Sequence, residues 1–122
     1  MSLREGLREL LASEEDIAAD EERAEATRHG AVQRCADAPN RQVVDFAGVV
    51  RSVVLRPREG VPALEAELYD GTGRVTLVWL GRRQIAGIEP GRRMTVHGFL
   101  CDVDGTRTIY NPRYELRARP GE

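Results

Sequence analysis

The hydrophobic positions of this chain follow two spacings, and the change between them falls near residue 40. In the first segment leucines recur at the spacing of one helix face, at Leu3, Leu7, Leu10 and Leu11. Ser13, followed three places later by Asp16, resembles an N-capping signature, so a second helix is expected to begin there. The pattern therefore predicts an α-helical N-terminal extension over residues 1–40.

Beyond Pro39 the hydrophobic residues alternate with polar ones, a period of two that is typical of half-buried β-strands. Five strands are predicted, over residues 44–55, 64–69, 74–80, 92–101 and 106–116. The run Asp70-Gly71-Thr72-Gly73 is the strongest hairpin signal. Asn111-Pro112 interrupts the last strand, which places that point at an edge or bulge. Gly48 lies where the long first strand could coil sharply or approach another backbone closely.

The connection between the third and fourth strands, residues 81–91, is too long for a tight hairpin and too short for a crossover helix with a parallel strand. One helical turn over residues 83–88 fits it, with Ile85 and Ile88 closing the end of the sheet. This order predicts an all-β fold, a five-stranded OB-fold barrel with an α-helical N-terminal extension. An SH3-like barrel is the main alternative, but it normally lacks so long a connection. We expect an acidic helical extension over residues 1–40, the barrel over residues 41–119 and a tail over residues 120–122.

The composition fits one domain, or one domain and a tail, in a chain of 122 residues. No stretch approaches about 18 apolar residues, and the N-terminus lacks the apolar run of a secretory signal, so we expect a cytoplasmic protein without a membrane partner. Aromatic residues make up only 5%, which argues against a large cofactor cavity. Cys35 and Cys101 lack the spacing of metal ligands. No cofactor, no metal site and two free thiols, buried or half-buried, are therefore expected.

Charge is divided unevenly along the chain, although the total of 18 basic and 20 acidic residues is nearly balanced. Residues 1–40 carry five arginines and ten acidic residues, a net charge of −5, whereas residues 41–122 carry thirteen arginines and ten acidic residues, a net charge of +3. The chain contains no lysine. A GC-rich genome can by itself explain this preference for arginine over lysine. As a result, the basic side chains are planar guanidinium groups, which suit contacts with phosphate and stacking on bases.

Several runs in the second segment resemble a known family. They are Asp70-Gly-Thr-Gly-Arg-Val-Thr-Leu-Val-Trp-Leu, Ile88-Glu-Pro-Gly-Arg-Arg, Val96-His-Gly and Asn111-Pro-Arg-Tyr-Glu-Leu. Together they are similar to the OB wedge domain of RecG-type branch-migration helicases, and more similar still to small stand-alone OB proteins of actinobacteria. The resemblance covers about residues 42–117 and implies an OB-fold that binds nucleic acid, single-stranded or branched DNA in particular. The chain has no phosphate-binding loop of a helicase motor, which requires a lysine.

OB-folds bind single strands by combining a cationic groove with aromatic platforms. The groove lies over the second and third strands and between the loops that join strands one to two and strands four to five. The candidate cations for phosphate contacts are Arg51, Arg56 and Arg58 at or near the first of these loops, Arg74 at the start of the third strand, and Arg107 just after the loop between strands four and five. Tyr69 and Tyr110 are the candidate stacking residues, although Glu65 and Glu67 share a face with Tyr69 and would repel phosphate. Trp79 lies in one row with Val75 and Leu77 and is expected in the core.

Two hypotheses from different classes follow. The first is a non-enzymatic OB-fold protein that binds single-stranded or branched nucleic acid, with DNA favoured and little sequence preference. The second is an OB-fold adaptor that binds a protein, or a second copy of itself, through the barrel surface and the N-terminal helices. A further hypothesis concerns the acidic run between Glu14 and Glu25, which could cover an arginine-rich groove as an inhibitory arm. No arrangement of serine, cysteine, histidine and carboxylate in the sequence indicates catalysis.

Overall fold

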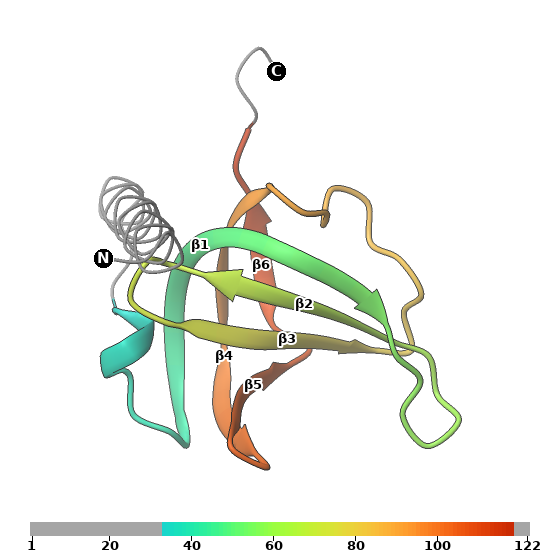
Figure 1. The fold of residues 1–122 in the computed structure, drawn as a ribbon, viewed down its shortest axis with the longest axis horizontal. Helices are drawn as coiled ribbons and strands as arrows, with labels where there is room; N and C mark the ends of the chain where they lie inside the picture. Colours follow the sequence, from blue (N-terminus) through green and yellow to red (C-terminus); the bar gives the residue numbers. More distant parts are fainter. Residues whose placement is uncertain (1–32, 119–122) are drawn as a thin grey trace, which may run out of the picture.

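The computed structural model describes residues 33–118, which form six strands and one short 3-10 helix (Figure 1). The elements in chain order are η1 (Cys35–Asp37), β1 (Gln42–Leu55), β2 (Ala63–Tyr69), β3 (Arg74–Leu80), β4 (Arg93–Val103), β5 (Thr106–Tyr110) and β6 (Arg113–Leu116). The two helices predicted before residue 33 and the acidic run lie outside the described residues. Between residues 33 and 40 the structure shows no α-helix, and η1 is the one helical element there, so this part of the expected helical extension is not supported.

Five of the strands form a closed ring. Antiparallel pairs join β1 to β2, β2 to β3, β4 to β5 and β1 to β4, and a parallel pair joins β3 to β5. Figure 1 shows β1, β2 and β3 on the near side of this ring, with β4 and β5 behind them. This strand order is the one predicted for an OB-fold. The sixth strand, β6, pairs with residues 94–97 of β4 outside the ring.

The interruption predicted at Asn111-Pro112 is confirmed. The fifth predicted strand is divided there into β5 and β6, because Asn111 adopts a positive φ of 50° and the following Pro112 cannot donate to a ladder. The conformation predicted for the connection between β3 and β4 is wrong. The predicted helical turn over residues 83–88 is a series of turns, within a connection whose glycines Gly81, Gly87 and Gly91 have positive φ values. Ile85 and Ile88 nevertheless lie in the core, as predicted.

The long strand β1 belongs to both halves of the ring. Its residues 42–49 pair with β4, and its residues 49–55 pair with β2. Gly48 lies where the strand passes from one partner to the other, and a Cβ atom there would collide with the backbone carbonyl of Tyr69. The predicted close approach of another backbone at Gly48 is therefore confirmed, and it explains how one strand can bend across both halves.

The core fills the inside of the ring. Its fully buried side chains include Phe46, Leu68, Leu77, Leu100 and Ile109. Trp79 is only 6% exposed, and its Nε1 donates a hydrogen bond to the carbonyl oxygen of Pro112 at 3.2 Å. This indole was expected in the core, and the structure confirms that expectation.

The segment before β1 is attached to the ring by polar contacts. Asp70 accepts hydrogen bonds from the backbone N–H groups of Thr72 and Gly73, which form the hairpin turn, and from that of Cys35 at 2.8 Å.

Both cysteines are free; Cys35 is buried and Cys101 half-buried. Burial raises the pKa of the Cys35 thiol to about 12, and the Asp70 carboxylate adds to this rise. Between residues 33 and 118 no helix has the length and apolar character needed to cross a membrane.

Candidate nucleic-acid interface

The strand register places several candidate residues on one outer face of the ring. Glu65 pairs with Val78, which pairs in turn with Tyr110, so the three form one row across β2, β3 and β5. Glu67 and Thr76 form the next row, and Tyr69 and Arg74 form the last. Paired residues point to the same side of a sheet, and the residues between these rows, such as Leu68 and Leu77, are buried in the core. We call this surface the arginine–tyrosine face; it consists of Arg51, Arg56, Arg58, Glu65, Glu67, Tyr69, Arg74 and Tyr110.

Tyr69 is covered by an arginine from β1. The β1–β2 register shifts between Val50 and Ser52, so Arg51 is the extra residue of a β-bulge. This bulge directs the Arg51 side chain over the Tyr69 ring, with the guanidinium carbon 3.7 Å from the ring centroid. The pair is a cation–π contact on an exposed surface. Sequence alternation alone could not place Arg51, because a bulge changes which side of the strand each later residue occupies.

A second arginine–tyrosine pair lies at the other end of the face. The guanidinium carbon of Arg58 lies 5.9 Å from the Tyr110 ring centroid, and its Nη1 lies 3.5 Å from the hydroxyl oxygen. Arg58 also forms an ion pair with Glu65, whose hydrogen bond raises the pKa of the guanidinium. The two-residue turn Glu59-Gly60 holds Arg58 in place, because Arg58 and Val61 exchange backbone hydrogen bonds of 2.8 and 2.9 Å across it.

Each glutamate of the face is paired with arginine. Glu65 also contacts Arg56, whose Nε lies 3.6 Å from its Oε2, and the Glu65 side chain is only 11% exposed. Glu67 is 31% exposed, and its Oε1 lies 3.7 Å from Nη1 of Arg74, a side chain that is 76% exposed. With four arginines and two glutamates, the face carries a net charge of +2. The repulsion expected from the glutamates is thus reduced by their own counter-ions.

Arg107 is the one sequence-predicted site residue that the structure places elsewhere. It is three residues before Tyr110 on β5 and so points to the opposite side of the strand. Its guanidinium donates hydrogen bonds to the backbone carbonyls of Cys35 and Ala38, and more weakly to Oδ1 of Asn40 at 3.4 Å. These contacts hold the segment before β1 against the ring.

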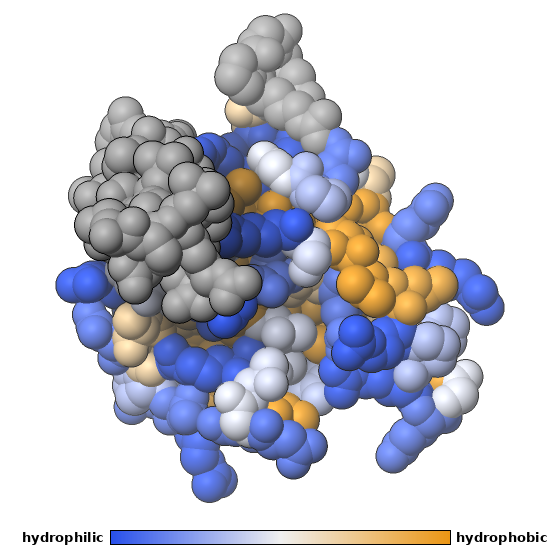
Figure 2. All heavy atoms as spheres, viewed as in Figure 1, coloured by the Kyte–Doolittle hydropathy of each residue, from blue (hydrophilic) through white to orange (hydrophobic). Residues whose placement is uncertain are grey.

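An apolar patch adjoins the arginine–tyrosine face at the carboxyl end of β1. Its exposed side chains are Val54, Leu55, Val61 and Leu80. Figure 2 shows apolar side chains gathered beside the end of β1, next to the hydrophilic surface over β2 and β3. Val54 pairs with Glu65, so this side chain lies on the same side of the sheet as the charged rows. No pattern in the sequence predicts this patch.

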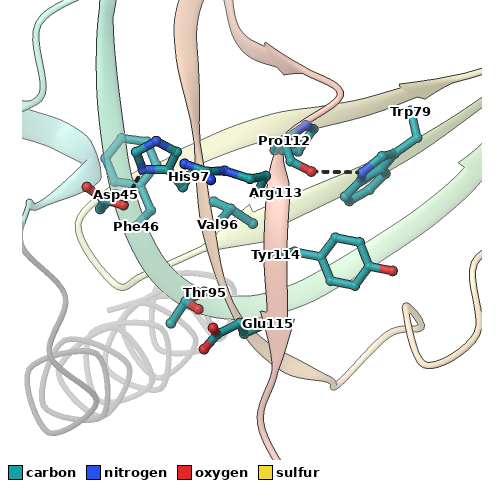
Figure 3. Close-up of a pocket in the computed structure, with 10 residues that line it drawn as sticks. All are labelled: Asp45, Phe46, Trp79, Thr95, Val96, His97, Pro112, Arg113, Tyr114 and Glu115. Atoms are coloured by element: carbon teal, nitrogen blue, oxygen red, sulfur yellow. Dashed lines mark hydrogen bonds and ion pairs between the residues drawn. The ribbon is translucent and has the colours of Figure 1, made fainter.

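A pocket of about 750 Å³ lies mainly over β1, β4 and β6. Asp45 of β1 and His97 of β4 face each other across the strand pair, with Oδ1 and Nδ1 2.7 Å apart. In Figure 3 these two residues and Arg113 lie on one side of β6, and Trp79 and Tyr114 lie on the other. The two aromatic rings pack edge to face, with centroids 5.7 Å apart. Among the described residues no group of three or more histidine, cysteine or carboxylate side chains could hold a metal ion.

No family model matches the chain, and no curated protein matches it. Solved structures with a similar fold include the p204 HINb domain, with a TM-score of 0.58 and 15% identity over 74% of this chain and 49% of that one. A structure of RecG bound to a three-way DNA junction gives a TM-score of 0.52 and 23% identity over 70% of this chain and 12% of that one. A structure of a Replication Protein A heterotrimer bound to ssDNA gives a TM-score of 0.50 and 18% identity, over 73% of this chain and 71% of that one.

The chain therefore spans about half of the matched p204 chain and a small part of RecG. At these identities the likeness shows a shared fold. The resemblance to RecG predicted from the sequence is confirmed at that level.

Proposed function

We propose that the protein binds single-stranded nucleic acid, DNA in the first place, through the arginine–tyrosine face. The observation that carries this proposal is the presence of two arginine–tyrosine pairs, Arg51 with Tyr69 and Arg58 with Tyr110, on one outer surface of the ring. Arginine supplies phosphate contacts, and tyrosine supplies a flat surface on which any base can stack.

The geometry of the face suits an extended strand. Tyr69 and Tyr110 are separated by four residues along the strands and by two strand spacings across them, which corresponds to about 17 Å along the sheet. A strand that follows this diagonal crosses β3 beside Thr76, with Arg74 next to Tyr69 at one end and Arg58 next to Tyr110 at the other. In the unbound protein Arg51 and Arg58 cover the rings, so bound bases would displace the guanidinium groups toward the phosphates.

The comparisons support DNA as the proposed ligand. The RecG structure holds a three-way DNA junction and the Replication Protein A structure holds ssDNA, and both share the fold of this chain. We therefore include branched DNA among the proposed ligands. The proposed activity is binding alone, without a catalytic step, in the cytoplasm.

Fluorescence anisotropy with the full chain tests the proposal. The labelled ligands are oligo(dT) and oligo(U) of about twelve nucleotides, a blunt duplex and a three-way junction, each at about 50 and 200 mM salt. We expect oligo(dT) to bind more tightly than the duplex and to weaken as salt rises. Tyr69→Ala and Tyr110→Ala should each weaken binding roughly tenfold.

Tyr114→Ala is the matched control for a lost aromatic ring, because Tyr114 is exposed on β6, outside the face. No binding of any oligonucleotide at low salt would refute the proposal and leave the adaptor hypothesis. Equal binding of the tyrosine variants and the wild type would refute the role of this face.

The inhibitory role of the acidic run remains a separate hypothesis. Deleting residues 1–32 tests it while keeping Cys35 and Ala38, whose carbonyls bind Arg107. Tighter oligonucleotide binding by the shortened chain is the expected result, and unchanged affinity would exclude an inhibitory arm.

A further inference from the structure

Two carboxylates lie in the middle of a face that otherwise suits a polyanion. Glu65 and Glu67 occupy neighbouring outward positions of β2, between the two arginine–tyrosine pairs. Each carboxylate repels phosphate, so each lowers the affinity for any nucleic acid. The two differ in their surroundings, however, and only one of them is available to a ligand.

Glu65 is used within the protein. Its side chain is 11% exposed, and its two oxygens contact Arg58 and Arg56. This carboxylate therefore holds two arginines at the edge of the face, and it has little capacity left for a ligand.

Glu67 is more open. Within residues 33–118 its one charged partner is Arg74, and that contact reaches only Oε1, at 3.7 Å between two partly exposed side chains. Tyr69 lies two residues further along β2 on the same face, about 6.8 Å away along the strand. The cross-strand neighbours of Glu67 are Ser52 on β1 and Thr76 on β3, which are small and leave the carboxylate accessible from solvent.

A base stacked on Tyr69 would thus present its edge to Glu67. An ionised carboxylate only accepts hydrogen bonds, and exocyclic amino groups of bases donate them; the N4 amino group of cytosine is a usual partner of glutamate. Thymine and uracil have no amino group. Their one donor on this edge is the N3–H, which lies between two carbonyl oxygens that would face the negative charge of the carboxylate. The same carboxylate therefore favours bases with an amino group over thymine and uracil.

We propose that Glu67 makes the arginine–tyrosine face selective for bases that carry an exocyclic amino group, over thymine and uracil. This inference rests on the proposed function and adds a modest preference to it. Because the carboxylate is partly exposed, we expect the lower end of the effect known for such contacts, about a fivefold difference in Kd.

The test compares two pyrimidine ligands, so that stacking area stays nearly constant. Anisotropy titrations with the full chain at about pH 8, where cytosine is unprotonated, use oligo(dC) and oligo(dT) of about twelve nucleotides. The wild type should bind oligo(dC) about five times more tightly than oligo(dT). Glu67→Gln keeps the side-chain size but adds an amide donor that can face a thymine carbonyl, so the ratio of the two Kd values should fall toward one.

Removing the negative charge should also tighten binding of both oligonucleotides, and this general effect needs a control. Glu115→Gln removes an equivalent charge from an exposed position of β6, outside the face, and should leave the ratio unchanged. If the wild type binds both oligonucleotides equally, or if Glu67→Gln keeps the wild-type ratio, the inference is overturned while the proposed function stands. If neither oligonucleotide binds, the proposed function itself fails.

Discussion

Replacing Arg107 by glutamine separates the structural role of this residue from the phosphate contact predicted for it. In the structure its guanidinium donates to the carbonyls of Cys35 and Ala38. Glutamine is shorter and carries no charge, so it cannot span both carbonyls. We therefore expect the Arg107→Gln variant to lose stability and to keep its affinity for oligonucleotides.

The size of the loss follows from the two hydrogen bonds. A hydrogen bond to a charged group contributes roughly 1.5 to 3 kcal/mol, so two of them contribute about 3 kcal/mol at the lower limit. The lower limit applies because Arg107 is only partly buried and water can reach part of the site. For a domain of this size, the same loss lowers Tm by roughly 10 to 20 °C.

Urea unfolding followed by the fluorescence of Trp79 measures this loss, since Trp79 is the only tryptophan of the chain. Amide exchange at Cys35, whose N–H donates to Asp70, reports whether the attached segment opens before the ring unfolds. Arg113→Gln removes an exposed arginine of β6 and serves as the control; it should change stability by less than about 0.5 kcal/mol. An equally small change in Arg107→Gln, together with a large loss of oligonucleotide affinity, would refute the structural role and restore the phosphate contact.

Three further predictions concern the ring and the segment attached to it before β1. Gly48→Ala should cost roughly 2 kcal/mol or more in urea unfolding, because the new Cβ collides with the carbonyl of Tyr69; an unchanged midpoint would contradict the close crossing. Asp70→Asn should lower Tm, because its amide cannot accept from the N–H groups of both the hairpin turn and Cys35 in the way a carboxylate does; an unchanged Tm would contradict this. The Cys35 thiol keeps its proton up to about pH 12 in the folded state but only to about 9 when unfolded. Stability should therefore fall above pH 9 by up to about 1.4 kcal/mol per pH unit, and Cys35→Ala should remove this component; identical slopes would contradict the assignment.

The sequence predicted the ring because alternation and turn residues act locally. The alternating run of β2 and the Asp70–Gly73 turn fix the β2–β3 hairpin without help from distant residues. Gly48 and Trp79 were also placed correctly, the first because a glycine inside a strand marks a close approach, the second because it shares a row with apolar neighbours.

The side chains of the face were less predictable, because their positions depend on contacts between distant segments. The ion pair of Arg58 with Glu65 requires both the Glu59-Gly60 turn and the β1–β2 register. The position of Arg51 over Tyr69 requires a β-bulge, and no residue pattern in the sequence predicts that bulge. Arg107 is different, since its alternation with Tyr110 already places the two on opposite sides of β5.

Mapping the bound oligonucleotide by NMR tests the central claim most directly. Amide resonances of the ¹⁵N-labelled full chain are followed during titration with oligo(dT) at low salt. We expect the largest shift changes at Arg51, Glu67, Tyr69, Thr76 and Tyr110, all on or beside the arginine–tyrosine face. Changes confined instead to the pocket side, over β4 and β6, would contradict the claim that nucleic acid binds across β2 and β3.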